Sequence, residues 1–513
     1  MQRRIEKIFP FALLALIVIT NLIPVGRAQK SNADFTPTIP KTWDDEAVAA
    51  LEVPLADPRY SPAQVSSDYY YRMPVRPIYK SYPIYAPGKE PPGYLDWLER
   101  QEPEIVFDAA RLKTDADWIL AGELVFHATK TFVPLSNMAT HEPEFYRKTG
   151  MPLAKDGTHP FQRYVIRKKG VVEVGSVSCA QCHTRVMPGG TVVKGAAGNP
   201  PFGAITAFFS RRRMVQDKDE GQQELARLLR GRRVRFSAPW IQPDPALSFI
   251  SLDENIANEE ATPPGVFARE GTGPLYPTKV PDLIGVKDRR YLDHTGLVRH
   301  RSIGDLMRYA ALNQDTQLLG RYGDFIPDGI DFRELPDPAT RSRYSDEQLY
   351  ALALYLYSLK PPPNPNKFDA LARRGQKVFQ SEGCAICHTP PLYTNNMLTP
   401  VEGFKATEEH RKKYDILPTS VGTDPSLALR ARRGTGYYKV PSLKGVWYRG
   451  PFEHNGSVAT LEDWFDPRRL RDDYAPTGFK PYGVKTRAVK GHEFGLELSA
   501  EDRRALIAFL KTL

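Results

Sequence analysis

All four cysteines of this 513-residue chain fall in two copies of one five-residue pattern. Cys179-Ala180-Gln181-Cys182-His183 and Cys384-Ala385-Ile386-Cys387-His388 both read C-x-x-C-H. This pattern is typical of covalent haem c attachment, in which two thiols bond the porphyrin and the histidine is an axial iron ligand. The alternative is a pair of local or crossed disulfides with both histidines incidental. A zinc site is disfavoured because no further cysteine is present to complete a tetrahedral set. We therefore expect two covalently bound haem c groups.

An internal repeat runs through the chain at a constant offset of 160 residues. Residues 279–286 (KVPDLIGV) recur as residues 439–446 (KVPSLKGV), and the match continues through His294-Thr295-Gly296 and His454-Asn455-Gly456. Two later segments, residues 349–359 and 506–513, have apolar residues at helical intervals. Each follows a serine that can cap a helix, Ser345 and Ser499. The repeat predicts two related domains, residues 111–362 and 363–513.

The beginnings of the two predicted domains also correspond, through a G-x-x-x-F spacing. Phe379 lies five residues before Cys384, whereas Phe126 lies 53 residues before Cys179, a difference of 48 residues. We therefore expect an insertion in the first domain. Residues 29–110 are rich in proline and tyrosine without a sustained period, which predicts an extended arm on the surface. The expected fold class is mainly α, with two tandem cytochrome c-like haem domains and long irregular extensions and loops.

The first 28 residues have the pattern of a secretory signal. A basic start with Arg3, Arg4 and Lys7 precedes an apolar stretch from Phe9 to about Ile23. This stretch is shorter than the roughly 20 residues that a membrane span needs. We expect a periplasmic or secreted protein without a stable membrane span after cleavage. An uncleaved anchor is the alternative.

Function depends on the second axial ligand of each haem iron, because an iron with a vacant position can bind peroxide or dioxygen. His294 and His454 occupy equivalent repeat positions, for which a structural or haem-edge hydrogen bond is the preferred interpretation. His492 lies seven residues before Ser499, and the corresponding residue of the first domain is Pro338. If His492 closes the second haem, the first haem lacks a counterpart and is open. His492 as a surface loop histidine is the other interpretation.

The second predicted domain resembles the bacterial dihaem cytochrome c peroxidase and MauG superfamily. The resemblance rests on residues 440–443 (VPSL), 451–458 (PFEHNGSV), 460–461 (TL) and the closing segment 506–511 (LIAFLK), and it extends over most of residues 111–513. The 205 residues between the haem motifs are closer to the rubber oxygenase, RoxA-like branch. The resemblance implies a six-coordinate C-terminal haem that relays electrons, with His492 as its distal ligand. It also implies an N-terminal haem that hosts the oxidant. The distal histidine, catalytic glutamate and bridging tryptophan of the peroxidases find no match.

The leading functional expectation is an exported oxidoreductase. Haem one, on His183, activates hydrogen peroxide or dioxygen, and haem two, on His388 and His492, relays electrons. Phe202, Phe208 and Phe209 are candidates for a pocket lining, although a core role is preferred. The formal charge of +10 favours a small acidic redox-partner protein, and without a concentrated basic face no nucleic acid is expected.

Two rival functions remain. In an electron-transfer cytochrome without its own substrate both haems are closed, and His294, His300 or Met187 completes haem one. A gas or redox sensor is the third, although no output domain is evident.

Overall fold

The computed structural model describes residues 37–513 apart from 217–222, 224–250, 268–276, 323–340 and 432. The expected signal segment, residues 1–28, and Pro338 lie outside the described residues. The structure is mixed, with 37% helix and 14% strand, whereas the sequence predicted a mainly α fold. Among the helices within the described ranges, none is both long and apolar enough to span a membrane.

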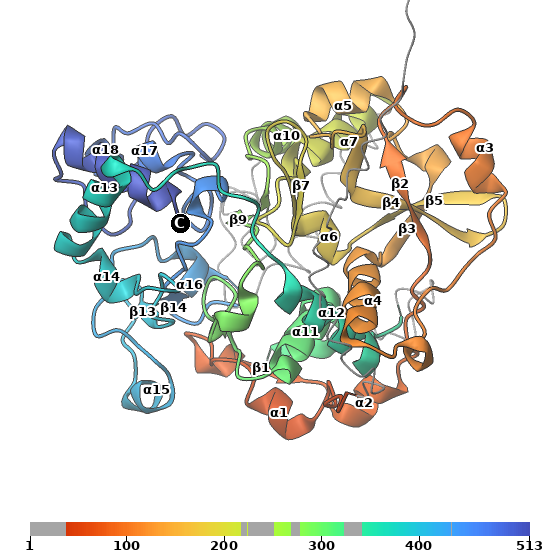
Figure 1. The fold of residues 1–513 in the computed structure, drawn as a ribbon, viewed down its shortest axis with the longest axis horizontal. Coiled ribbons are helices and arrows are strands. Elements are labelled where there is room, and N and C mark those ends of the chain that lie inside the picture. The colour runs from red at the N-terminus through yellow and green to blue at the C-terminus, as the bar shows by residue number, and fades with distance from the viewer. Residues whose placement is uncertain (1–36, 217–222, 224–250, 268–276, 323–340, 432) are drawn as a thin grey trace, which may run out of the picture.

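The elements are short and alternate along the chain (Figure 1). The α-helices of the described residues are α1 (Asp45–Ala49), α2 (Ser67–Arg72), α3 (Tyr94–Glu99), α4 (Asp115–His127), α5 (Pro143–Thr149), α6 (Cys179–Cys182), α7 (Phe202–Gln216), α10 (Leu252–Glu260), α11 (Ile303–Leu319), α12 (Asp346–Ser358), α13 (Ala370–Ser381), α14 (Cys384–Cys387), α15 (Glu408–Lys413), α16 (Ser426–Arg430), α17 (Leu461–Trp464) and α18 (Ala500–Lys511). The strands are β1 (Pro62–Gln64), β2 (Ser81–Tyr85), β3 (Thr131–Pro134), β4 (Thr158–Lys168), β5 (Val171–Ser176), β6 (Thr184–Val186), β7 (Val192–Lys194), β8 (Val266–Phe267), β9 (Thr278–Lys279), β10 (Tyr291–Leu292), β11 (Val298–Arg299), β12 (Gly320–Tyr322), β13 (Leu398–Pro400) and β14 (Tyr437–Lys439).

A pair of crossed helices organises each half of the molecule. α4 packs on α12 in the first half, and α13 packs on α18 in the second half. A glycine stands at each crossing, because a Cβ on Gly122 would lie 2.0 Å from the Ala351 carbonyl oxygen and one on Gly375 would lie 1.8 Å from that of Ala505. The backbones therefore touch at these points, which explains the glycine of both G-x-x-x-F patterns.

The later helix of each pair begins at its expected cap. At α12, Ser345 Oγ accepts from the Gln348 amide at 3.1 Å, and Gln348 Oε1 accepts from the Ser345 amide at 3.0 Å. At α18, Ser499 Oγ accepts from the Asp502 amide at 3.1 Å, while the second bond runs between the two side chains at 2.9 Å. The predicted starts of both helices are thereby confirmed.

Part of the first-half insertion forms an antiparallel sheet that the sequence did not predict. The strand order is β2-β4-β5-β3, with β4 and β5 joined through Lys169 and Gly170, the latter at φ +77. β3 follows α4, whereas β2 comes from the N-terminal arm and pairs with β4. This sheet lies on the side of the molecule away from the second half (Figure 1).

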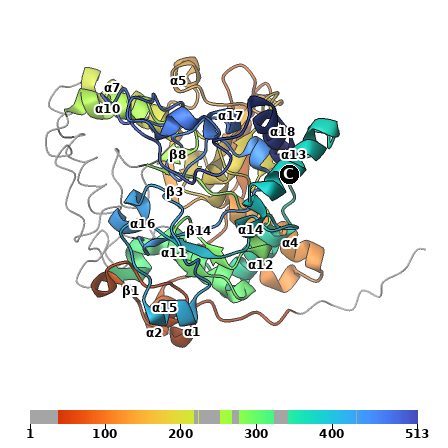
Figure 2. The same ribbon diagram turned by 90° about the vertical axis from the view of Figure 1, so that its left-hand side faces the viewer.

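The arm is an integral part of the first core. Trp43 and Tyr70 are fully buried and stack with ring centroids 4.7 Å apart. They join a hydrophobic cluster that includes residues of α4, α11 and α12. Figure 2 shows α1 and α2 lying along one side of α11 and α12. The arm, residues 37–110 where described, thus packs as short helices and strands rather than as a loosely applied surface segment.

The two halves also exchange equivalent hydrogen bonds. The Lys279 amide donates to the His454 carbonyl at 2.7 Å, and the Lys439 amide donates to the His294 carbonyl at 3.1 Å. These four residues stand at the two 160-residue-related positions of the repeat. The repeated segments therefore pack against each other reciprocally.

Candidate haem-binding sites

The first C-x-x-C-H motif is a single helical turn that presents its histidine to a cavity. Ser178 caps α6 by accepting from the Gln181 amide at 3.1 Å. His183 Nδ1 donates to the Pro281 carbonyl at 3.0 Å. This bond fixes the tautomer in which Nε2 keeps its lone pair, the form required of an iron ligand.

The second motif, α14, has the same arrangement. His388 Nδ1 donates to the Pro441 carbonyl at 3.1 Å, with the Tyr393 carbonyl at 3.2 Å. Pro281 and Pro441 are repeat partners, so both histidines are oriented by the same carbonyl of the repeat. The structure describes all four cysteines and records thiols rather than disulfides.

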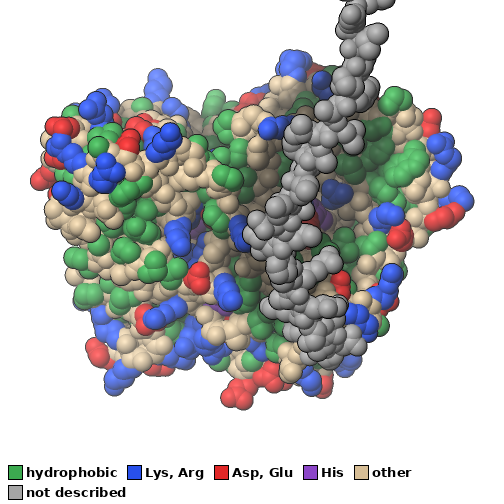
Figure 3. Space-filling view, in the orientation of Figure 1, with side chains coloured by type: hydrophobic (Ala, Val, Ile, Leu, Met, Phe, Trp, Pro, Cys, Tyr) green, Lys and Arg blue, Asp and Glu red, His purple; other side chains and the backbone are tan. Residues whose placement is uncertain are grey.

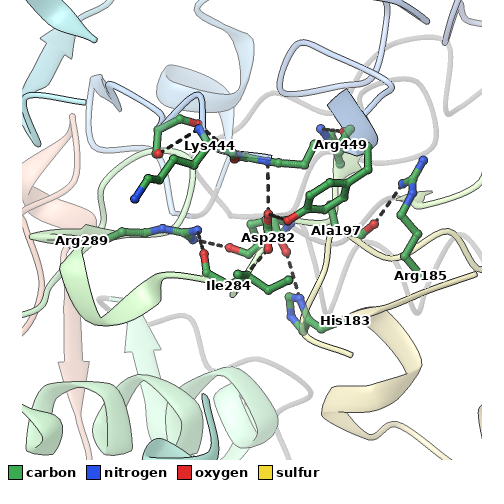
Figure 4. A network of polar contacts seen from close by, with 12 residues as sticks. His183, Arg185, Ala197, Asp282, Ile284, Arg289, Lys444 and Arg449 are labelled. Carbon is green, nitrogen blue, oxygen red and sulfur yellow. Dashed lines mark hydrogen bonds and ion pairs between the residues drawn. The ribbon is translucent and has the colours of Figure 1, made fainter. Parts of the chain in front are cut away.

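Arginines hold the loops that orient the two histidines. Arg449 donates to the Ser442 and Lys444 carbonyls at 2.7 and 2.8 Å, and Arg289 makes the equivalent bonds to the Asp282 and Ile284 carbonyls. The first loop has an additional bond across the halves, because Arg449 Nε also lies 3.4 Å from Asp282 Oδ2 (Figure 4). Haem-site geometry in one half therefore depends on the other half.

A cavity opens beside His183. Cys179, Cys182 and the Pro281 loop line one part, and α11 lines another. Burial lowers the pKa of Lys439 to about 7 and that of Arg289 to about 10, and both line the cavity. The Arg289 cation and the hydrogen-bonding Lys439 amino group suit the two anionic propionates of a haem, and the thiols and His183 suit its covalent attachment, so the residues present fit haem c.

The α11 wall carries polar groups along one helical face. Leu306, Tyr309, Ala310, Asn313 and Gln314 line the cavity at intervals of three and four residues. The Tyr309 hydroxyl donates to Asp293 Oδ2 at 3.1 Å. Asp293 also pairs with Arg433 of the second half at 3.1 Å. Burial is the largest effect on the pKa of Asp293 and acts to raise it, but Arg433, His294 and Lys439 together lower that pKa below its usual value.

The structure places the three expected alternative ligands of haem one differently. His294 lines the cavity, but its Nε2 donates to the Lys279 carbonyl at 2.7 Å, and burial lowers its pKa to about 4. His300 uses both ring nitrogens, on the Arg289 carbonyl and the Tyr357 hydroxyl. Met187 packs in a separate apolar cluster with Tyr448. Within the described residues, His183 and His294 are the histidines that line this cavity, and no methionine lines it.

At the second site His492 lies within electrostatic reach of His388. Burial lowers the pKa of His492 to about 3, and the charge of His388 is the next cause. The His492 ring packs against Trp464 and Phe494, with centroids 5.3 and 5.6 Å away. Among the described residues, its buried Nδ1 has no hydrogen-bond partner. The pairing of His388 and His492 as ligands of one iron stays a prediction.

Arg469 holds the loop that carries His492. Its side chain is fully buried and donates to the Trp464, Val489 and His492 carbonyls at 2.9, 2.9 and 2.6 Å. Gly491 is needed beside it, because a Cβ there would lie 2.7 Å from Glu453 Oε1. No local pattern indicates Arg469, because its partners are backbone carbonyls up to 23 residues away.

His454 and the predicted pocket phenylalanines have other surroundings. His454 stacks on Tyr438, with centroids 5.2 Å apart, and lines a second cavity of about 630 Å³ with Glu453. Phe208 and Phe209 pack with Phe145 in a separate cluster. Phe202 contacts Phe267, which does line the haem-one cavity and was missed.

The comparisons with known proteins agree with this haem chemistry. A family model described as RoxA-like, cytochrome c-like matches residues 436–474. The chain is 31% identical to the methylamine utilization protein MauG of Methylorubrum extorquens over 28% of this chain and 34% of the relative. These matches support the resemblance to the dihaem cytochrome c peroxidase and MauG superfamily.

Two further members of this superfamily are similar over parts of their length. MauG of Paracoccus denitrificans is 28% identical over 35% of this chain and 53% of its own. Cytochrome-c peroxidase IdrP1 of Denitromonas iodatirespirans is 29% identical over 28% of this chain and 40% of its own. The chain thus matches between about a third and about half of these relatives' length. These similarities support haem c as the cofactor.

Proposed function

We propose that the protein is an exported dihaem c-type cytochrome that activates hydrogen peroxide or dioxygen at haem one and relays electrons through haem two. Cys179 and Cys182 hold haem one, and Cys384 and Cys387 hold haem two. The halves are two tandem cytochrome c-like domains, residues 111–362 and 363–513. Bound haem supplies the iron-centred redox chemistry, while the chain supplies ligands and a shaped pocket.

One observation carries the proposal, namely that different side chains lie near the histidines of the two C-x-x-C-H motifs. His492 lies near enough to His388 for their charges to interact, and it would complete a bis-histidine haem two. The α11 wall of the haem-one cavity instead brings Tyr309, Asn313 and Gln314. Amide groups are hydrogen-bonding groups rather than strong iron ligands, and the Tyr309 hydroxyl is engaged as a donor to Asp293. This asymmetry favours an open haem one beside a closed haem two.

The chain's own groups suit a small polar oxidant. Leu306 and Ala310 make the α11 wall apolar between its polar positions. The hydroxyl of Tyr309 is held by Asp293, so its orientation is fixed before any oxidant arrives. Reduction of one hydrogen peroxide to two waters consumes two electrons and two protons. A small redox-partner protein supplies the electrons, and protons come from solvent.

The surface charge supports a protein partner rather than a polyanion. Lysine and arginine side chains are scattered over the face in Figure 3 and are interspersed with acidic ones. Such a distribution steers an acidic partner without forming a nucleic-acid groove. The rival function is an electron-transfer cytochrome with both haems closed. For this function His294 would have to break its hydrogen bond to the Lys279 carbonyl and ligate haem one.

Anaerobic mixing of the fully ferrous protein with one equivalent of hydrogen peroxide distinguishes these functions. We expect both haems to be oxidised at a stoichiometry of one peroxide per chain. The matched control is the same sample saturated with carbon monoxide, which occupies an open ferrous haem and should slow the reaction strongly. A ferrous spectrum that persists with peroxide, with or without carbon monoxide, would establish the electron carrier instead.

A further inference from the structure

α11 is interrupted where it leaves the haem-one cavity. Asp315 has φ −131 and ψ 31, outside the helical region. The two residues before it, Asn313 and Gln314, line the cavity, and Gln314 Nε2 donates to Cys179 Sγ at 3.5 Å. The position of this break therefore decides where two of the polar groups in the wall stand relative to the haem attachment.

Two buried cations hold Asp315, and both belong to additions outside the repeated core. Arg76 of the arm contacts both carboxylate oxygens of Asp315 at 3.1 and 3.2 Å. Lys130, at the start of the insertion, contacts Asp315 Oδ1 and donates to the Gln314 carbonyl at 3.0 Å. All three side chains are at most 5% exposed. Although burial acts to raise the pKa of Asp315, Arg76 and Lys130 outweigh it and keep that pKa low.

Arg76 also joins this break to the beginning of α12. It donates to the Ser342 carbonyl at 2.7 Å and lies over the Tyr344 ring at 4.3 Å. Its own carbonyl accepts from Gln348 Nε2 at 2.9 Å. Because a guanidinium donates in a fixed planar fork, these contacts specify a direction as well as a distance.

The arm also contacts α11 and the strand that follows it, β12, at two further places. β1 pairs with β12 directly after the helix, with Gln64 opposite Gly320. Near the middle of α11, Arg308 Nη2 donates to the Lys41 carbonyl at 3.2 Å. The arm therefore contacts the chain both before and after the break. Asp315, between these contacts, is the point at which the arm determines the direction of α11.

We propose that Arg76 is a positioning residue for the haem-one site, which fixes the α11 break at Asp315 and thereby places Asn313 and Gln314 in the cavity wall. This role deepens the proposed function, because it assigns to the N-terminal arm the geometry of the oxidant-binding side. Arg76 touches neither haem attachment nor oxidant and acts through Asp315.

Cyanide titration of the ferric holoprotein tests the proposal, with Arg76→Gln and Arg76→Lys as variants. Arg76→Gln leaves the buried pair Lys130 and Asp315 with balanced charges, so folding is expected to survive. We expect cyanide binding at haem one to weaken about ten-fold in Arg76→Gln, the effect of about one misplaced hydrogen bond. In Arg76→Lys the loss should be about three-fold, because the charge remains and the fork is lost.

Trp43→Phe is the matched control. It loosens the packing of the arm on Tyr70 without touching Asp315. We expect a lowered melting temperature and cyanide affinity within two-fold of wild type. The haem-two signals should be unchanged in every variant. If Arg76→Gln does not fold, Lys130→Gln, which keeps the pair of Arg76 and Asp315, should weaken cyanide binding by an intermediate factor.

The outcomes separate this inference from the proposed function. A folded Arg76→Gln protein with wild-type cyanide affinity would overturn the positioning role. If the wild-type protein itself binds no cyanide, the open haem of the proposed function is wrong. The positioning role is then decided by the ferric electron paramagnetic resonance signal of haem one, which must shift in Arg76→Gln and not in Trp43→Phe.

Discussion

Substitution of Gly375 by alanine should disrupt the crossing of α13 and α18. The added Cβ would lie 1.8 Å from the Ala505 carbonyl oxygen and 2.8 Å from Phe509 Cβ. A carbon–oxygen contact needs about 3.3 Å, so the two backbones must separate by roughly 1.5 Å. Such overpacking costs about 3 kcal/mol, at the upper end of measured values, because a carbonyl cannot rotate away. Alanine returns about 1 kcal/mol through its helix propensity. The net loss of stability is about 2 kcal/mol.

Urea denaturation of the holoprotein, followed by circular dichroism and by haem absorbance, measures this loss. Arg373→Ala, on the exposed face of the same helix, should stay within about 0.5 kcal/mol of wild type. Gly122→Ala should repeat the effect in the first half, since its Cβ would lie 2.0 Å from the Ala351 carbonyl oxygen. A Gly375→Ala protein that is more stable by about 1 kcal/mol would show only the helix propensity of alanine. Such a result would mean that the added Cβ does not clash with the Ala505 carbonyl, and it would refute the close helix crossing.

Three further predictions concern single side chains. His492→Ala should leave both haems attached and convert haem two to high spin, so unchanged optical spectra would remove His492 as a ligand. Arg469→Met leaves three carbonyls without their donor and should cost about 3 kcal/mol in urea denaturation, with partial high-spin haem two; a loss below about 1 kcal/mol would contradict its role. Burial raises the pKa of Glu52 to about 7 from 4.5, so the native state keeps a proton that the unfolded chain has lost. The free energy of unfolding should therefore fall by about 1–3 kcal/mol as pH rises from about 4.5 to 7, and in Glu52→Gln this contribution should be missing. Parallel pH profiles of the two proteins would exclude a contribution from Glu52.

Features that depend on nearby residues were predictable. The caps at Ser345 and Ser499 and the glycine spacing at the two helix crossings each involve a pattern of a few residues. The 160-residue repeat located the equivalent loops, whose prolines accept from His183 and His388. That equivalence could be anticipated because the repeat preserves the backbone contacts of both motifs.

Features that depend on distant partners were not predictable. Arg76 and Asp315 are 239 residues apart, and neither has a local pattern that indicates a buried ion pair. The four-stranded sheet was missed because β2 comes from the arm and β4 from the insertion. The arm was expected to be a surface extension. The alternation at Tyr82 and Ile84 therefore did not lead to the prediction of a strand, because no partner strand was expected beside it. The cavity face of α11 was likewise hidden, since helical periodicity does not distinguish a cavity wall from core.

Low-temperature electron paramagnetic resonance of the fully ferric protein, before and after a small excess of hydrogen peroxide, tests the central claim most directly. We expect one low-spin signal from haem two, with His388 and His492 as its ligands. We also expect one high-spin signal that changes with peroxide. A half-reduced sample should be measured alongside, because reduction of haem two can alter the ligation of haem one. Two low-spin signals that ignore peroxide in both oxidation states would contradict an open haem on His183.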